Sequence, residues 1–159
     1  MTGAADRRRD PEPRARSVDP RAATRRRVPS RARSLVLIVD DSVDTRELYA
    51  AYFRHRGFDA ITAPDGDAGI DIAVRTKPDV IVLDLAMPRM SGLSAGHHLK
   101  HDPRTRKIPQ ILLTGFGYRA IHEGALEMGV DVFLTKPCLP EDLEREVMTL
   151  LNAAPDSKR

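Results

Sequence analysis

The stretch Val80-Ile81-Val82-Leu83-Asp84 consists of four apolar residues followed directly by a carboxylate. A short, continuous apolar run rich in β-branched residues is typical of a strand that is buried on both faces of a parallel sheet. A second run, Leu35-Val36-Leu37-Ile38-Val39, is followed by Asp40 and Asp41. Because ligands bind beyond the carboxyl ends of the strands in an open parallel sheet, these three carboxylates are candidates for one site.

Outward from these two runs, strand-like and helix-like segments alternate along the chain. Ser42 or Asp44 can cap a first helix, and Gly57 is a suitable residue just after its end. The predicted strands cover 35–39, 58–62, 80–83, 108–113 and 130–134, and the predicted helices end near 56, 76, 101, 128 and 151. Five repeats of strand then helix predict an α/β fold with a five-stranded parallel sheet and helices on both faces, in a doubly wound arrangement.

The charge of the chain is unevenly distributed. Residues 1–33 hold 11 arginines and four acids, a balance of +7, whereas residues 34–159 hold 15 basic and 19 acidic residues, a balance of −4, and the two sum to the stated +3. We predict a disordered Arg/Pro-rich tail over 1–33, because it has too few apolar residues to form a core. A folded domain over 34–152 and a flexible C-terminus over 153–159 complete the expected organisation.

The tail admits three interpretations: a solvated segment, a segment upstream of the true start of translation, or a basic arm that contacts nucleic acid or an acidic partner. No aromatic residue lies among its arginines to stack on bases. Elsewhere, no apolar run approaches the roughly 20 residues that span a bilayer, and no signal peptide is evident. With Cys138 as the sole cysteine, a cytoplasmic protein without a membrane partner is the simplest expectation.

Further polar residues follow the later predicted strands. Thr114 follows the fourth strand, and Lys136 lies just past the fifth. Three carboxylates at one sheet edge repel each other, and a hard divalent cation such as Mg²⁺ or Mn²⁺ would relieve that repulsion. A carboxylate beside such a cation and a lysine is also suited to phosphoryl chemistry, with Asp84 as the nucleophile.

These motifs together resemble the receiver domain of bacterial two-component response regulators, in its stand-alone form. The resemblance covers about Ser34 to Leu151. The matching stretches are 35–41, Ala63-Pro64-Asp65-Gly66, Val80 to Pro88 with Gly92, Ile111-Leu112-Leu113-Thr114-Gly115, and Gly129 to Pro137. The implied fold is flavodoxin-like, and the implied function is a phosphorelay step rather than turnover of an external substrate.

The resemblance implies a role for each matching position. Asp84 matches the phospho-accepting aspartate. Asp40 and Asp41 match the acidic pair that holds Mg²⁺, with Asp41 the more direct ligand, and the backbone carbonyl of Ala86 matches the third ligand position.

Three further roles follow from the same resemblance. Thr114 matches the hydroxyl that closes onto the phosphoryl group, Lys136 matches the lysine that pairs with that group, and Phe133 matches the aromatic switch residue. The Lys136–Pro137 bond matches one that is typically cis in the family.

The sequence departs from the commonest family pattern at a few positions. Ser91 stands where an aspartate often precedes the glycine, Gly115 replaces a frequent alanine, and Phe133 lacks the hydroxyl of a frequent tyrosine. Ala86 and Phe116 flank the site with apolar side chains, so no residue there can position an attacking water. We therefore expect slow self-dephosphorylation.

Two other classes of protein share parts of this pattern but need residues that the chain lacks. Phosphatases of the haloacid dehalogenase type also use a strand-end aspartate, but they need a second aspartate two residues later, where this chain has Ala86. A dinucleotide-binding fold needs a glycine-rich turn after the first strand, where Asp40-Asp41-Ser42 would repel a pyrophosphate.

The expected partners follow from the resemblance. A sensor histidine kinase or a phosphotransfer protein would supply the phosphoryl group. Since the sequence leaves no room for a second folded domain after Leu151, output is expected through altered contacts with an unidentified downstream protein, or through relay of the phosphoryl group.

Overall fold

The computed structural model describes residues 33–115, 123–124 and 127–153. The chain divides into two units, residues 1–30 and residues 31–159, and all described elements belong to the second. The predicted tail over 1–33 lies almost wholly outside the described residues. The same is true of most of the helix predicted over 117–128 and of residues 154–159.

Five parallel strands form one sheet in the order β2-β1-β3-β4-β5. The strands are β1 (Leu35–Val39), β2 (Asp59–Ala63), β3 (Val80–Asp84), β4 (Gln110–Thr114) and β5 (Val132–Thr135). The centre of the sheet is β3, which pairs with β1 on one side and β4 on the other. All five residues of β3 are buried, so the strand that ends in Asp84 is enclosed along its whole length.

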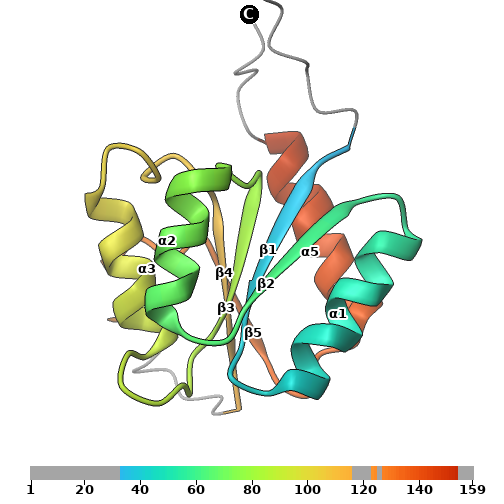
Figure 1. Ribbon diagram of the computed structural model, residues 1–159, viewed down its shortest axis with the longest axis horizontal. Helices are drawn as coiled ribbons and strands as arrows, with labels where there is room; N and C mark the ends of the chain where they lie inside the picture. The colour runs from blue at the N-terminus through green and yellow to red at the C-terminus, as the bar shows by residue number, and fades with distance from the viewer. Residues whose placement is uncertain (1–32, 116–122, 125–126, 154–159) are drawn as a thin grey trace, which may run out of the picture. The chain divides into compact units, whose positions relative to one another are not determined.

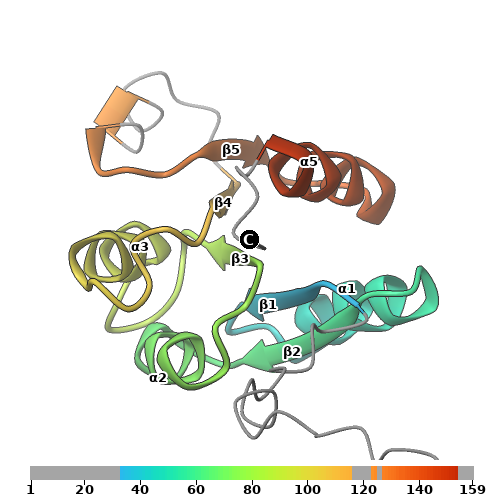
Figure 2. The same cartoon turned by 90° about the horizontal axis from the view of Figure 1, so that it is seen from above.

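Four described helices cover the two faces of this sheet (Figures 1 and 2). They are α1 (Val43–His55), α2 (Gly66–Thr76), α3 (Gly92–His101) and α5 (Pro140–Ala153). Helices α1 and α5 lie on one face, and α2 and α3 lie on the other. Within the described residues, none of these helices has the length and apolar character that would let it cross a membrane.

Alternate residues of each strand belong to two separate cores, one on each face of the sheet. Val80 and Val82 of β3 belong to the core beneath α1 and α5, with Phe53 at its centre. Ile81 and Leu83 of the same strand belong to the core beneath α2 and α3. Successive side chains of a strand point to opposite faces, so a strand covered on both faces must be apolar at every position. This explains the continuous runs in the sequence.

Three of the described βα connections on the site side begin their helix with a polar cap. Ser42, Asp65 and Ser91 are the N-cap residues of α1, α2 and α3, and their side chains accept hydrogen bonds from backbone N–H groups in the first turn. Such caps satisfy donors that the helix itself leaves unpaired. After α1, Gly57 adopts φ +90°, the left-handed conformation predicted for the residue after the helix end.

The prediction of the fold is confirmed, and the differences are confined to boundaries. The second strand lies one residue later than predicted. The fourth begins at Gln110 rather than Ile108, and the fifth begins at Val132 rather than Val130. The last helix extends to Ala153, beyond the predicted end at Leu151. The peptide bond between Lys136 and Pro137 is cis, as predicted.

Candidate functional site

The three predicted acids come together at the carboxyl edge of the sheet. Asp40 follows β1, Asp84 ends β3, and Asp41 stands beside Asp40. One ligand oxygen from each of the three lies within 4.8 Å of the others. Asp40 and Asp84 are buried, and Asp41 is exposed. The parallel topology produces this convergence, because neighbouring strands β1 and β3 end at the same edge.

Lys136 joins this cluster from the segment after β5. Its Nζ lies 3.1 Å from Oδ2 of Asp40 and 3.1 Å from Oδ1 of Asp84. The other oxygen of Asp40, Oδ1, accepts the Ser42 backbone N–H at 2.8 Å. Both Asp40 oxygens are therefore engaged by the protein, whereas the Asp41 carboxylate forms no hydrogen bond or ion pair with the described residues.

The charges in the cluster act on one another. Burial, followed by the charge of Asp40, raises the pKa of Asp84, and Lys136 opposes this shift. For Lys136, burial alone would lower the pKa, but hydrogen bonds to Asp84 and Asp40 outweigh it and raise the pKa. The lysine thus remains protonated at neutral pH, while burial and the charge of Asp40 disfavour the ionised form of Asp84.

The other predicted residues lie around this cluster. Thr114 is the buried last residue of β4, on the strand next to β3. The backbone N–H of Lys136 donates to the Thr114 carbonyl at 2.6 Å. Phe133 is half-buried in β5 and packs against the core beneath α2 and α3. Ala86 is exposed in the loop after β3. Phe116 lies outside the described residues.

Gly92 has a role at the site that sequence reasoning did not assign. A Cβ atom at this position would lie 2.1 Å from the backbone oxygen of Asp84. The Gly92 N–H donates to the Leu85 carbonyl at 3.0 Å, which holds the start of α3 against the end of β3. Close backbone approach is the reason for glycine here. The signal in the sequence was only its fixed distance of eight residues after Asp84.

Helix α1 also contacts the segment that follows Lys136. The Tyr49 hydroxyl donates to the Cys138 carbonyl at 2.7 Å, and burial raises the pKa of Tyr49 to about 12. Tyr52 donates to Glu144 of α5 at 2.5 Å, and Arg56 pairs with the same carboxylate at 3.1 Å. These bonds tie α1 to the β5–α5 segment.

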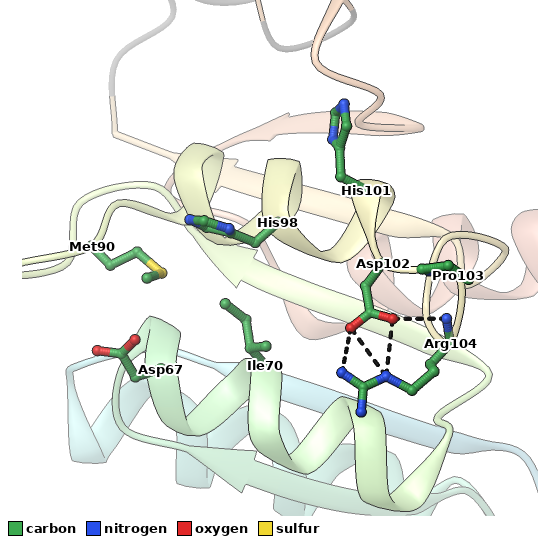
Figure 3. Close-up of a pocket in the computed structure, with 8 residues that line it drawn as sticks. All are labelled: Asp67, Ile70, Met90, His98, His101, Asp102, Pro103 and Arg104. Atoms are coloured by element: carbon green, nitrogen blue, oxygen red, sulfur yellow. Dashed lines mark hydrogen bonds and ion pairs between the residues drawn. The ribbon is translucent and has the colours of Figure 1, made fainter.

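A groove of about 770 Å³ lies away from the acids, between α2 and α3 (Figure 3). Ile70 and Met90 form part of its apolar lining, and Asp102 pairs with Arg104 at one end. None of the three acids lines it. A phosphoryl group attached to a strand end needs no enclosed pocket, so the acid cluster remains the candidate site.

The residues of the cluster fit a hard cation. All three side chains offer carboxylate oxygens, the donors that Mg²⁺ and Mn²⁺ prefer. Asp41 has no competing partner among the described residues, and the ammonium of Lys136 leaves the cluster with a formal charge of about −2. Within the part of the chain that the structure describes, no other group of three His, Cys, Asp or Glu side chains could hold a metal.

In a comparison with known protein families, the model of the response regulator receiver domain matches residues 36–148 of this chain. Similar curated proteins include the DNA-binding dual master transcriptional regulator RpaA of Synechocystis, 34% identical over 73% of this chain and 48% of that protein. The phosphate regulon transcriptional regulatory protein PhoB of Escherichia coli is 32% identical over 73% of this chain and 51% of its own length.

Solved structures give the same result. The chemotaxis protein CheY4 of Vibrio cholerae has a TM-score of 0.72 and 28% identity, over 76% of this chain and all of that one. The receiver domain of a histidine kinase from Syntrophus aciditrophicus has a TM-score of 0.72 and 32% identity, over 79% of this chain and 95% of its own. This chain spans about half the length of the first curated relatives.

Proposed function

Since this chain belongs to the response regulator receiver domain family, we propose that Asp84 accepts a phosphoryl group from a phosphohistidine on a partner protein. The observation that carries the proposal is the position of Lys136, 3.1 Å from both Asp84 and Asp40, with Asp41 beside them. The donor is a sensor histidine kinase or a phosphotransfer protein.

In the proposed transfer, an oxygen of Asp84 attacks phosphorus, an O–P bond forms, and the N–P bond to histidine breaks. The leaving nitrogen keeps the electron pair of that bond and takes a proton from water. Lys136 stays protonated and can pair with a phosphoryl oxygen in place of the Asp84 carboxylate. A divalent cation at Asp40, Asp41 and the Ala86 carbonyl would supply charge stabilisation for the phosphoryl oxygens.

We further propose that Thr114 and Phe133 respond to the new group. Thr114 ends β4, the strand next to the one that Asp84 ends, and a hydroxyl can donate to a phosphoryl oxygen. Phe133 is only half-buried and lies three residues before Lys136, so a movement of Thr114 and Lys136 can change its packing. The result is a shift between two states that alters contacts with a downstream protein.

The phosphorylated state should be long-lived. Ala86 is exposed beside the site and offers no group that could orient water, and no second acid stands two residues after Asp84. We therefore propose that the domain catalyses only the phosphorylation of its own Asp84 and a slow dephosphorylation, without turnover of an external substrate. A phosphoryl half-life of seconds without a phosphatase would contradict this part of the proposal.

Binding of beryllium trifluoride, a phosphoryl mimic, tests the central proposal. NMR shifts at Thr114 and Phe133 would be followed with and without Mg²⁺. Wild type should bind only with Mg²⁺, and Asp84→Asn should lose at least about 100-fold in affinity, because a neutral amide replaces the anionic carboxylate to which beryllium would bind.

Asp79→Asn is the matched control, since Asp79 directly precedes the strand that Asp84 ends, and it should bind like wild type. If wild type does not bind beryllium trifluoride in the presence of Mg²⁺, the acid cluster is not a working phosphorylation site.

A further inference from the structure

Arg46, in the first turn of α1, contacts the segment that carries the acid pair. Its Nη1 lies 3.3 Å from the backbone oxygen of Asp40 and 3.5 Å from that of Asp41. Sequence reasoning gave this residue no role. A guanidinium is always charged and presents several donors in a rigid plane, so one side chain can serve both carbonyls.

These two carbonyls lie between regular elements. Strand β1 ends at Val39, and the N–H of Arg46 donates to the Ser42 carbonyl, one residue beyond the acid pair. Within the described residues, no backbone N–H donates to the carbonyl of Asp40 or Asp41. Arg46 therefore supplies a hydrogen bond that neither the sheet nor the helix provides.

The two acids differ in how much they depend on this contact. The Asp40 carboxylate is held directly by the Ser42 N–H and by Lys136. The exposed Asp41 carboxylate has no such partner among the described residues. Its position is set by its own backbone, and Arg46 is the side chain bound to that backbone.

We propose that Arg46 is a positioning residue that holds the Asp40–Asp41 peptide so that the Asp41 carboxylate faces the cation position. This inference rests on the proposed function, because it assumes that the acid pair holds a divalent cation. Groups that orient metal ligands commonly change metal affinity by 10- to 100-fold when they are removed.

The sign of the effect separates positioning from simple electrostatics. A positive side chain near a cation site repels the cation, so Coulomb's law alone predicts that removing Arg46 tightens Mg²⁺ binding. Positioning predicts the opposite, a weaker affinity. Arg46→Lys keeps the charge but offers a single point of contact, so it should fall between wild type and Arg46→Met.

Arg54 provides a matched control on the same helix. Its Nη2 donates to the Ala60 carbonyl at 3.0 Å, in strand β2 and away from the acids. Arg54→Met therefore also removes one arginine bond to a backbone oxygen. The full chain and the three variants would be titrated with Mg²⁺ alone by calorimetry, and exchange of the Ser42 amide hydrogen would be measured without metal.

Arg46→Met should weaken Mg²⁺ binding by about tenfold and speed exchange of the Ser42 amide, while Arg54→Met leaves both within about twofold of wild type. Equal or tighter Mg²⁺ binding by Arg46→Met would overturn the inference, as would equal weakening by Arg54→Met. A wild type that binds no Mg²⁺ would instead overturn the proposed function, and this inference with it.

Discussion

The aspartates at the two ends of β3 differ in burial and in the groups that surround them. Asp79 directly precedes the strand, and its Oδ2 accepts the Leu35 N–H at 2.7 Å. At the same edge, Asp131 accepts the Gln110 N–H at 2.8 Å and pairs with Lys100 at 3.1 Å. Asp84, at the other end of the strand, is more deeply buried and lies against two further acids.

The difference shows how one residue type serves structure or chemistry. At the edge with Asp79 and Asp131, each carboxylate accepts a hydrogen bond from the backbone N–H of the first residue of a strand, so it has a structural role. At the edge with Asp84, the raised pKa of that residue indicates charge that the protein does not fully satisfy. A divalent cation bound at this edge would offset that charge.

The largest expected effect comes from closing the contact behind Asp84. Gly92→Ala places a carbon 2.1 Å from the Asp84 backbone oxygen, so either α3 or the end of β3 must move. We expect a loss of about 3 kcal/mol in unfolding free energy, measured by urea denaturation, together with weaker Mg²⁺ binding.

Gly115→Ala is the control for this change, because a Cβ there meets no atom within 4 Å. It should change the unfolding free energy by less than about 1 kcal/mol. Equal losses in the two variants would mean that the close approach at Gly92 has no special importance.

The second effect concerns the structural acids. Asp131→Ala removes the side-chain acceptor of the Gln110 N–H and one of the acceptors of the Lys100 ammonium, so we expect a loss of about 2 kcal/mol in unfolding free energy. Mg²⁺ affinity, measured by calorimetry, should be unchanged because the residue lies at the opposite edge. A change in Mg²⁺ affinity as large as that of an acid-cluster variant would erase the distinction between the two edges.

The third expected effect is a gain in unfolding free energy rather than a loss. Asp84→Asn removes a charge that burial and Asp40 oppose, so without metal it should stabilise the fold by about 1 kcal/mol, seen as a higher Tm. In wild type, the raised pKa means that the folded state binds the Asp84 proton more tightly than the unfolded chain. Unfolding free energy therefore falls as pH rises from about 4 through the raised pKa.

The variant should lack that part of the pH dependence, and saturating Mg²⁺ should raise its Tm less than it raises that of wild type. A lower Tm for Asp84→Asn in metal-free buffer would show that the acid cluster is satisfied by the protein alone.

The smallest expected effect comes from backbone conformation, because each edge of the sheet has a nearby non-glycine residue with a positive φ. Arg89 in the loop after β3 has φ 66°, and Lys77 after α2 has φ 49°. Asparagine tolerates this conformation better than either residue. Arg89→Asn also loses an exposed ion pair with Asp65, so the net gain in unfolding free energy should be about 0.5 kcal/mol.

Lys77→Asn should also increase the unfolding free energy, as measured by thermal unfolding. Opposite signs at the two positions would mean that side-chain contacts outweigh the backbone there.

The sequence was sufficient to predict features that depend on local chemistry. Continuous apolar runs predicted β1 and β3, because both faces of the sheet are covered. Ser42 was one of two predicted cap residues for the first helix, with Asp44, and it is the N-cap of α1. The strand-end positions of Asp40, Asp41 and Asp84 followed from the same runs, so the acid cluster could be predicted before any geometry was known.

The features that escaped prediction depend on contacts between distant segments. Ile108 and Val130 are apolar and pack into the core, yet they precede the strands to which they were assigned, because burial extends beyond the hydrogen-bonded ladder. Gln110 begins β4 fully buried, which no hydropathy pattern would indicate. The contact of Arg46 with the acid pair likewise requires knowledge of the side-chain direction.

The bond between Tyr49 and the Cys138 carbonyl gives the protein an optical probe of its own. The chain has three tyrosines and no tryptophan, so its near-ultraviolet spectrum is simple. A shift of the segment after Lys136 would alter the hydrogen bond of the Tyr49 phenol and hence its absorption. Burial raises the pKa of Tyr49 to about 12, and the hydrogen bond to Glu144 raises the pKa of Tyr52. Neither phenol therefore ionises at neutral pH, so a change in their absorption there reports a change in hydrogen bonding rather than in protonation.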